Sequence, residues 1–181
     1  MKTKRPPPPR PRRPSTSSTA GFRVLFLDFD GVLSPTTEPD ANDTVVHTPL
    51  FGWMPVLVAL LRPHPDVAIT VHSTWRYTHD IDELKGVLGP LGGRVLGAVP
   101  HGPRHDSILE WLRLNPQVTS YRILDDALSE FSSPLPAELI VCDPSAGVSA
   151  PGVQARIRAW LDEEPASASG TARTPQPSSG G

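Results

Sequence analysis

The chain has 181 residues, of which 38% are hydrophobic and 20% charged, and it contains 23 prolines and 14 glycines. This length suits one catalytic domain, because a single core usually takes about 100 to 200 residues. The lone Cys142 excludes a disulfide framework within the chain and a cysteine zinc site. Since no run of about 18 apolar residues could cross a bilayer, we expect a soluble, cytoplasmic protein without membrane association.

The two ends account for much of the proline excess. Residues 1–20 hold six prolines and six basic residues without an acid, and residues 165–181 are mostly Ser, Gly, Ala, Thr and Pro. Neither stretch can offset the entropy of ordering itself, so we predict disordered tails around a domain at 21–164. That domain holds 10 of the 17 basic residues and all 19 acids, hence about nine net negative charges. This balance argues against a domain that binds nucleic acid by bulk electrostatics but leaves room for a local basic site. The basic tail could tether an anionic polymer or be an ordinary extension.

Short apolar runs rich in Val, Ile and Leu alternate with longer amphipathic segments between the tails. This alternation is typical of parallel strands joined by crossover helices. We therefore predict an α/β fold, a Rossmann-like three-layer sandwich with a mostly parallel five-stranded sheet. In chain order, the predicted elements are a strand at Val24–Leu27, a helix at Trp53–Leu61, a strand at Val67–Val71, a helix at Asp80–Leu88, a strand at Arg94–Val99, a helix at Asp106–Leu114, strands at Tyr121–Leu124 and Glu138–Cys142, and a last helix from near Pro151.

Local patterns support two of these helices. Asp80 and Glu83 have the spacing of a capping box at a helix start. The segment Ser34–Asp66 is the one long insertion, and we interpret it as a loop and one helix, which is too little for more than a minimal cap. The last helix has an apolar face made of Val153, Ile157, Trp160 and Leu161.

The most specific motif follows the first predicted strand and comprises Leu27-Asp28-Phe29-Asp30-Gly31-Val32-Leu33. In an extended segment, Asp28 and Asp30 point the same way, toward the strand end where open α/β sheets bind ligands. Two carboxylates this close repel each other, which favours a site with a divalent cation or with two different protonation states. The alternative is a solvated turn with two merely polar acids.

This motif resembles the first motif of the haloacid dehalogenase-like (HAD) phosphohydrolases. The resemblance implies that Asp28 is the nucleophile and that Asp30 is the general acid and then the general base. The superfamily also places a Ser or Thr at the end of its second strand, where it hydrogen-bonds a phosphoryl oxygen. Ser73 matches this position, with Thr74 as the alternative. A Ser-Thr turn that caps a helix is the competing interpretation.

Two further HAD motifs have candidates. The basic residue before a helix is best matched by Arg104, where the superfamily usually has lysine, and Lys85 is the substitute. A solvated arginine at a helix start is the alternative. Asp125 and Asp126 match the acid pair after the fourth strand and would complete a magnesium site with Asp28 and Asp30. Magnesium prefers oxygen ligands. No metal-ligand spacing is found among His47, His72, His101 and His105.

The motifs taken together resemble more narrowly the HAD domain of Swiss Army Knife RNA repair proteins. The resemblance covers roughly Arg23 to Leu161 and adds the helix Ile108–Leu112 and Asp143 followed by Gly147-Val148-Ser149. It implies a terminal phosphate on RNA or DNA as the substrate. We expect Asp143 to cap a turn rather than to tune the metal site.

We therefore predict magnesium-dependent hydrolysis of a phosphomonoester through an aspartyl-phosphate. A phosphatase of small metabolites and a non-catalytic binding or scaffold protein are the alternatives, and the oligomeric state stays open. Trp75 and Arg76 could stack on a base and hold a second phosphate, but we favour a packed indole and a surface guanidinium. Cys142 is expected to be an inert core thiol.

Overall fold

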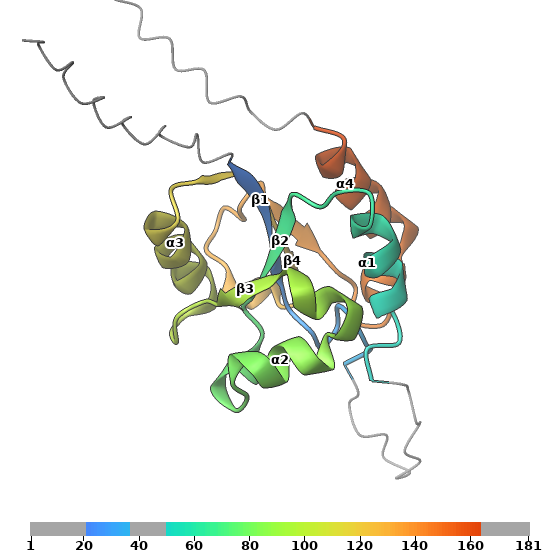
Figure 1. Cartoon of the computed structure of the whole chain (residues 1–181), viewed down its shortest axis with the longest axis horizontal. Coiled ribbons are helices and arrows are strands. Elements are labelled where there is room, and N and C mark those ends of the chain that lie inside the picture. The colour runs from blue at the N-terminus through green and yellow to red at the C-terminus, as the bar shows by residue number, and fades with distance from the viewer. Residues whose placement is uncertain (1–20, 37–49, 164–181) are drawn as a thin grey trace, which may run out of the picture.

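A computed structural model describes residues 21–36 and 50–163. The predicted tails and residues 37–49, which include most of the predicted loop, lie outside these residues, so the domain limits 21–164 stay a prediction. Five parallel strands form one sheet in the order β3-β2-β1-β4-β5 (Figure 1). The α/β class with its parallel sheet is thereby confirmed. The strands are β1 at Phe22–Leu27, β2 at Val67–Val71, β3 at Val95–Ala98, β4 at Val118–Asp125 and β5 at Leu139–Val141.

The helices follow the predicted order with small shifts at their ends. They are α1 at Met54–Leu61, α2 at Ile81–Val87, α3 at Arg104–Leu114 and α4 at Pro151–Leu161, with short 3-10 helices η1 at Thr74–Tyr77, η2 at Gly89–Arg94, η3 at Leu128–Glu130 and η4 at Gly147–Ser149. The predicted capping box is present, because Asp80 accepts from the Glu83 backbone at 2.9 Å and Glu83 accepts from the Asp80 backbone at 2.8 Å. It satisfies donors that would otherwise lack partners at the start of α2.

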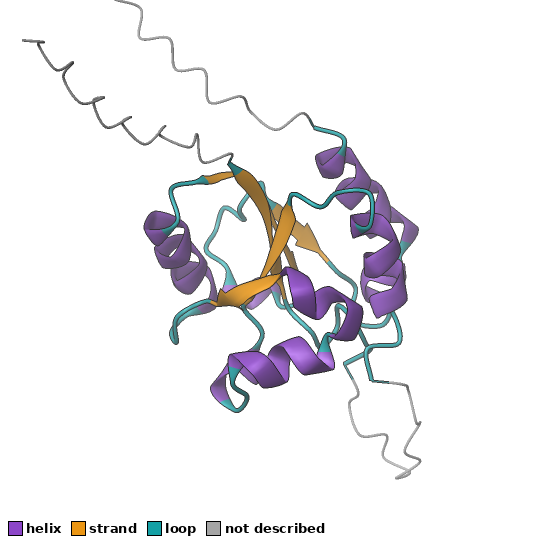
Figure 2. Ribbon diagram, viewed as in Figure 1, coloured by secondary structure: helices purple, strands orange, loops and turns teal. Residues whose placement is uncertain are grey.

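Helices cover both faces of the sheet, as Figure 2 shows. Because successive residues of a strand point to opposite faces, β1 contributes to two cores. Leu25 and Leu27 lie in the core that includes residues of α1, α2 and α4, whereas Val24 and Phe26 lie in the core against α3. The predicted apolar face of α4 is buried as expected at Val153, Ile157, Trp160 and Leu161.

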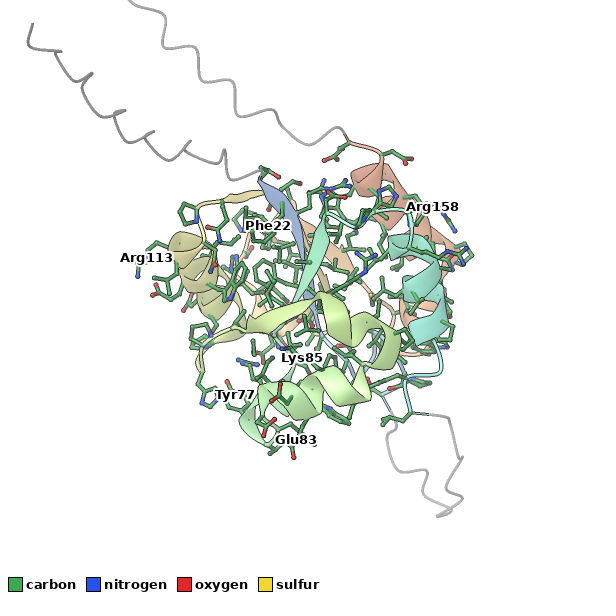
Figure 3. All side chains as sticks on the ribbon, in the orientation of Figure 1. Phe22, Tyr77, Glu83, Lys85, Arg113 and Arg158 are labelled. Atoms are coloured by element: carbon green, nitrogen blue, oxygen red, sulfur yellow. The ribbon has the colours of Figure 1, made fainter. Side chains whose placement is uncertain are left out.

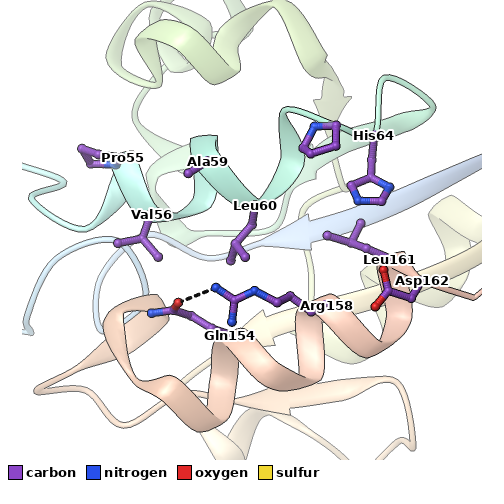
Figure 4. A pocket seen from close by; sticks show the side chains of 10 residues that line it. Pro55, Val56, Ala59, Leu60, His64, Gln154, Arg158, Leu161 and Asp162 are labelled. Carbon is purple, nitrogen blue, oxygen red and sulfur yellow. Dashed lines mark hydrogen bonds between the residues drawn. The ribbon is translucent and has the colours of Figure 1, made fainter.

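A groove of about 640 Å³ lies between α1 and α4 and is lined by residues that include His64, Gln154 and Arg158 (Figure 4). It holds none of the predicted site residues. The location of the candidate site is set by the carboxyl ends of the strands and not by this groove.

Among the helices that the structure describes, none has the length and apolar character to cross a membrane.

Candidate active site

The carboxyl end of the central strand β1 lies between those of its two neighbours, β2 and β4. The register pairs Leu27 with the last residue of β2 on one side and with Leu124 of β4 on the other. The next residue of each chain segment is therefore Asp28, His72 or Asp125, and all three are buried, with 4%, 0% and 1% exposed. Each offers one possible ligand atom, and these atoms lie within 4.8 Å of one another. Register alone thus gathers three polar groups at one point of the edge.

Arg104 completes this cluster from the first turn of α3. Its Nη1 donates to Oδ2 of Asp125 at 2.7 Å and also to Oδ2 of Asp28. The second oxygen of each acid accepts a backbone N–H, that of Phe29 for Asp28 and that of Ala127 for Asp125, both at 2.8 Å. The two carboxylates are therefore fixed so that their Oδ2 atoms converge on the guanidinium.

His72 contacts the same oxygen of Asp125, with its Nε2 at 2.8 Å from Oδ2. We assign the proton to Nε2, because a carboxylate can only accept. Burial alone would raise the pKa of Asp125, but hydrogen bonds and charge from His72 and Arg104 lower it below its ordinary value. Burial likewise opposes the charge on Arg104, yet Asp28 and Asp125 raise its pKa. The site therefore keeps Asp125 as an anion beside a permanent cation.

Asp126 lies next to this cluster, against the turn that follows Asp28. A Cβ atom on Gly31 would come within 2.2 Å of Oδ2 of Asp126, and Gly31 has φ +70, so only glycine suits the position. Burial and the negative charges of Asp28 and Asp125 raise the pKa of Asp126. Asp126 thus borders the cluster, whereas the group of three possible ligands consists of Asp28, His72 and Asp125.

Asp30 and Ser73 both contact Trp75. Oδ2 of Asp30 accepts a hydrogen bond from the indole Nε1 at 3.0 Å. The buried Ser73 is the N-cap of η1, and its Oγ accepts the Trp75 backbone N–H at 3.4 Å. This is the capping geometry considered as the alternative for Ser73, while the neighbouring Thr74 is exposed. Both hydroxyl residues come shortly after β2, behind His72, at the same edge of the sheet as Asp28.

The expectation of a surface guanidinium at Arg76 is wrong. Arg76 is only 7% exposed, and it donates to the backbone oxygens of Ser73 at 3.0 Å and Gly102 at 3.2 Å. The reason is that carbonyl groups in the turn after β2 need donors once they are buried. Arg76 thereby ties this turn to the loop that leads into Arg104. Burial lowers the pKa of the Arg76 guanidinium.

The basic group that contacts the carboxylates is Arg104 and not Lys85. Lys85 lies in α2 (Figure 3). Its Nζ is 4.0 Å from Oδ1 of Asp82. Asp143 follows β5 and accepts from the backbone N–H of Ser145 at 2.8 Å, which is the turn-capping arrangement. The buried Cys142 has its pKa raised to about 12 by burial, which leaves its thiol protonated.

His72 is the site residue that sequence reasoning missed. Spacing along the chain is the wrong criterion for His72, because β2 brings this histidine beside Asp28 and Asp125. Its position directly after a buried strand, the same as that of Asp28, was the available signal. The carboxylate oxygens of Asp28 and Asp125 fit a magnesium ion, which favours hard oxygen ligands, and an imidazole nitrogen beside them also suits other divalent metals.

A parallel sheet with an acid pair after its central strand β1 and another at the end of the neighbouring strand β4 defines a HAD-like α/β protein. The family described as HAD domain in Swiss Army Knife RNA repair proteins matches residues 24–153. The chain belongs to this family and, through it, to the superfamily of HAD-type phosphohydrolases. No curated protein and no solved structure matched the chain.

Proposed function

We propose that this protein is a magnesium-dependent phosphomonoester hydrolase that acts through an aspartyl-phosphate on Asp28. One observation carries the proposal: Nη1 of Arg104 contacts both Asp28 and Asp125 at the carboxyl edge of the sheet. A candidate nucleophile, a cation able to bind phosphate and an acid able to bind a metal thus share one point. Family membership supports HAD-type hydrolysis as the chemistry.

In the first step, a carboxylate oxygen of Asp28 attacks the phosphorus atom, and the bond from phosphorus to the leaving oxygen breaks. Asp30 gives its proton to that leaving oxygen. Arg104 offsets the charge on the phosphoryl oxygens, with Ser73 or Thr74 as an additional hydrogen-bond donor. Asp28, Asp125 and the main-chain carbonyl of Asp30 would hold magnesium, with Asp126 beside them, and the bound ion would reduce repulsion between nucleophile and phosphate.

In the second step, the deprotonated Asp30 takes a proton from a water molecule. The oxygen of that water attacks the phosphorus atom, and the bond between phosphorus and Asp28 breaks. Inorganic phosphate leaves, and Asp30 is again protonated for the next cycle. Asp30 therefore works in both steps, whereas Asp28 supplies the oxygen that carries the phosphoryl group.

We further propose the terminal phosphate of RNA or DNA as the substrate, and the cytoplasm as the location. The family description, which names RNA repair, supports the substrate class. The insertion Ser34–Asp66 is too short for a separate cap domain, which supports a site open to the end of a polymer. The acidic domain would then bind that end through a local site and not through its net charge.

A phosphatase screen with magnesium tests the proposal. It compares p-nitrophenyl phosphate, free nucleotides, sugar phosphates and oligonucleotides phosphorylated at the 3' or 5' end. We expect turnover by the wild type, loss of turnover in Asp28→Asn, and retained turnover in Asp143→Asn. Asp143 is the matched control, since it also follows a strand at this edge but caps Ser145. Full activity of Asp28→Asn would refute the nucleophile assignment.

The intermediate can be observed directly in Asp30→Asn. With p-nitrophenyl phosphate, whose leaving group needs little protonation, this variant should still transfer phosphate to Asp28 but hydrolyse the product slowly. Mass spectrometry should then find a phosphorylated protein that Asp28→Asn does not form. A phosphorylated residue other than Asp28 would refute the mechanism.

A further inference from the structure

We propose that Trp75 is a positioning residue that fixes the carboxylate of Asp30 for proton transfer. The inference rests on the proposed function, in which Asp30 protonates the leaving oxygen and then activates water. It starts from one contact, the hydrogen bond from the indole Nε1 of Trp75 to Oδ2 of Asp30 at 3.0 Å. Among the residues that the structure describes, no other side chain hydrogen-bonds this carboxylate.

The indole is held in place from several directions. Its ring stacks on His79 with centroids 4.9 Å apart and an interplanar angle of 22°. Phe51 and Phe29 pack against it at 5.4 Å and 5.7 Å between centroids. Ser73 additionally accepts the backbone N–H of Trp75. A donor on a ring packed this way has little freedom to follow a moving partner, so it determines where Oδ2 of Asp30 lies.

The indole also determines what each oxygen of Asp30 can do. An indole N–H can only donate, so Trp75 stabilises Oδ2 as a hydrogen-bond acceptor and cannot take a proton from it. Oδ1 is then the oxygen that carries and exchanges the proton. Because proton transfer needs donor and acceptor within about 2.6 to 3.2 Å, a carboxylate free to rotate would lose productive geometry much of the time.

The same contacts argue against Trp75 as a stacking platform for a substrate base. His79 covers the ring with a nearly parallel imidazole, and two phenylalanines contact it as well. The packed indole expected from the sequence is therefore the better description. The polar group of the ring, its N–H, donates to Asp30.

Kinetics of Trp75→Phe test the proposal, because phenylalanine retains an aromatic ring but has no N–H. An alkyl leaving group, as in a 3'-phosphorylated oligonucleotide, needs the proton from Asp30, whereas p-nitrophenolate does not. We expect kcat on the oligonucleotide to fall about tenfold with KM unchanged, a fraction of the 10²–10⁴ that general acid–base catalysis contributes. The burst of p-nitrophenol, which reports transfer of phosphate to Asp28, should stay within about threefold of the wild-type rate.

Trp160→Phe is the matched control. Trp160 also donates its indole N–H to one side chain, Oγ of Ser120 at 2.8 Å, but it belongs to α4 and is buried in the core. Any loss of activity in this variant should be the same on the oligonucleotide and on p-nitrophenyl phosphate. Equal losses on both substrates in Trp75→Phe, with an active wild type, would overturn the positioning role and leave the proposed function intact.

A second measurement does not depend on activity. The indole N–H resonance of Trp75, assigned by its loss in Trp75→Phe, should move in Asp30→Asn because the carboxyl acceptor of its hydrogen bond becomes an amide. The Trp160 resonance should stay in place. An unmoved Trp75 resonance would overturn the proposal. Absence of wild-type turnover on every phosphomonoester, with the Trp75 resonance still shifted, would instead refute the proposed function and the use of the contact in catalysis.

Discussion

Nη1 of Arg104 lies 2.7 Å from Oδ2 of Asp125, and the same nitrogen contacts Asp28. The side chains of all three residues are largely buried, so the guanidinium offsets two negative charges that water screens poorly. A divalent cation held by Asp28 and Asp125 would need the same two carboxylates. Arg104 and the metal are therefore expected to compete for the two carboxylates until a phosphate gives Arg104 another partner.

The first prediction concerns Arg104→Met, which removes the charge and keeps much of the side-chain volume. Without magnesium, the free energy of unfolding should fall by about 3 kcal/mol, because two buried acids lose their counter-charge. Added magnesium should raise the melting temperature of the variant more than that of the wild type. Arg113→Met, on the same helix but with a 68% exposed side chain paired to Glu110, is the control. Equal stabilisation by magnesium in wild type and Arg104→Met would contradict the competition.

The second prediction concerns His72, which is fully buried and hydrogen-bonded to Oδ2 of Asp125. His72→Ala should weaken magnesium binding about 10- to 100-fold, as is typical when a hydrogen-bond partner of a metal ligand is lost. His72→Gln can again donate to Asp125 and should retain most of the affinity. Melting temperatures at increasing magnesium concentrations measure the magnesium affinity of both variants. Unchanged affinity in His72→Ala would assign this histidine to packing alone.

The third prediction concerns the turn after Asp28. Gly31→Ala should lower the free energy of unfolding by at least about 1 kcal/mol, because alanine disfavours φ +70. It should also reduce turnover, since the new Cβ would displace the carboxylate of Asp126. Gly86→Ala is the control, because nothing lies within 4 Å of a Cβ there and its helix should gain about 0.5 to 1 kcal/mol. Urea unfolding measures the change in the free energy of unfolding, and steady-state kinetics measure the change in turnover.

The fourth prediction is a pH dependence at the ion pair of Arg23 and Asp66, far from the site. Arg23 donates to Asp66 at 2.7 Å, and this hydrogen bond lowers the pKa of Asp66 below its usual 3.8. A lowered pKa in the folded state means that the pair stabilises the protein above the unfolded pKa and loses this contribution as pH falls through the folded pKa.

Asp66→Asn should therefore cost about 1 kcal/mol near neutral pH, a modest value because the Asp66 side chain is 40% exposed and screened by solvent. The difference from wild type should shrink below about pH 4 and vanish once both states are protonated. Unfolding by urea at a series of pH values measures it. A difference that grows toward acid would contradict the assigned sign.

Local patterns in the sequence were sufficient for the elements of the fold. The buried strand before Asp28, the capping box at Asp80 and the apolar face of α4 each depend on residues a few positions apart, and each is present in the structure. The placement of acids after β1 and β4 follows from the same reasoning, because parallel strands end at a common edge. These features could be predicted since the interactions behind them are short-range.

Contacts between distant segments were decided only by the tertiary structure. The register of β1 with β2 places His72 beside Asp28, a relationship between positions 44 residues apart that no spacing rule along the chain contains. Packing of the turn after β2 buries Arg76, which local polarity assigned to the surface, and it directs the indole of Trp75 to Asp30. Sequence therefore determined which chemical groups reach the edge of the sheet. Strand register and burial decided which of them touch, because both depend on how the whole core packs.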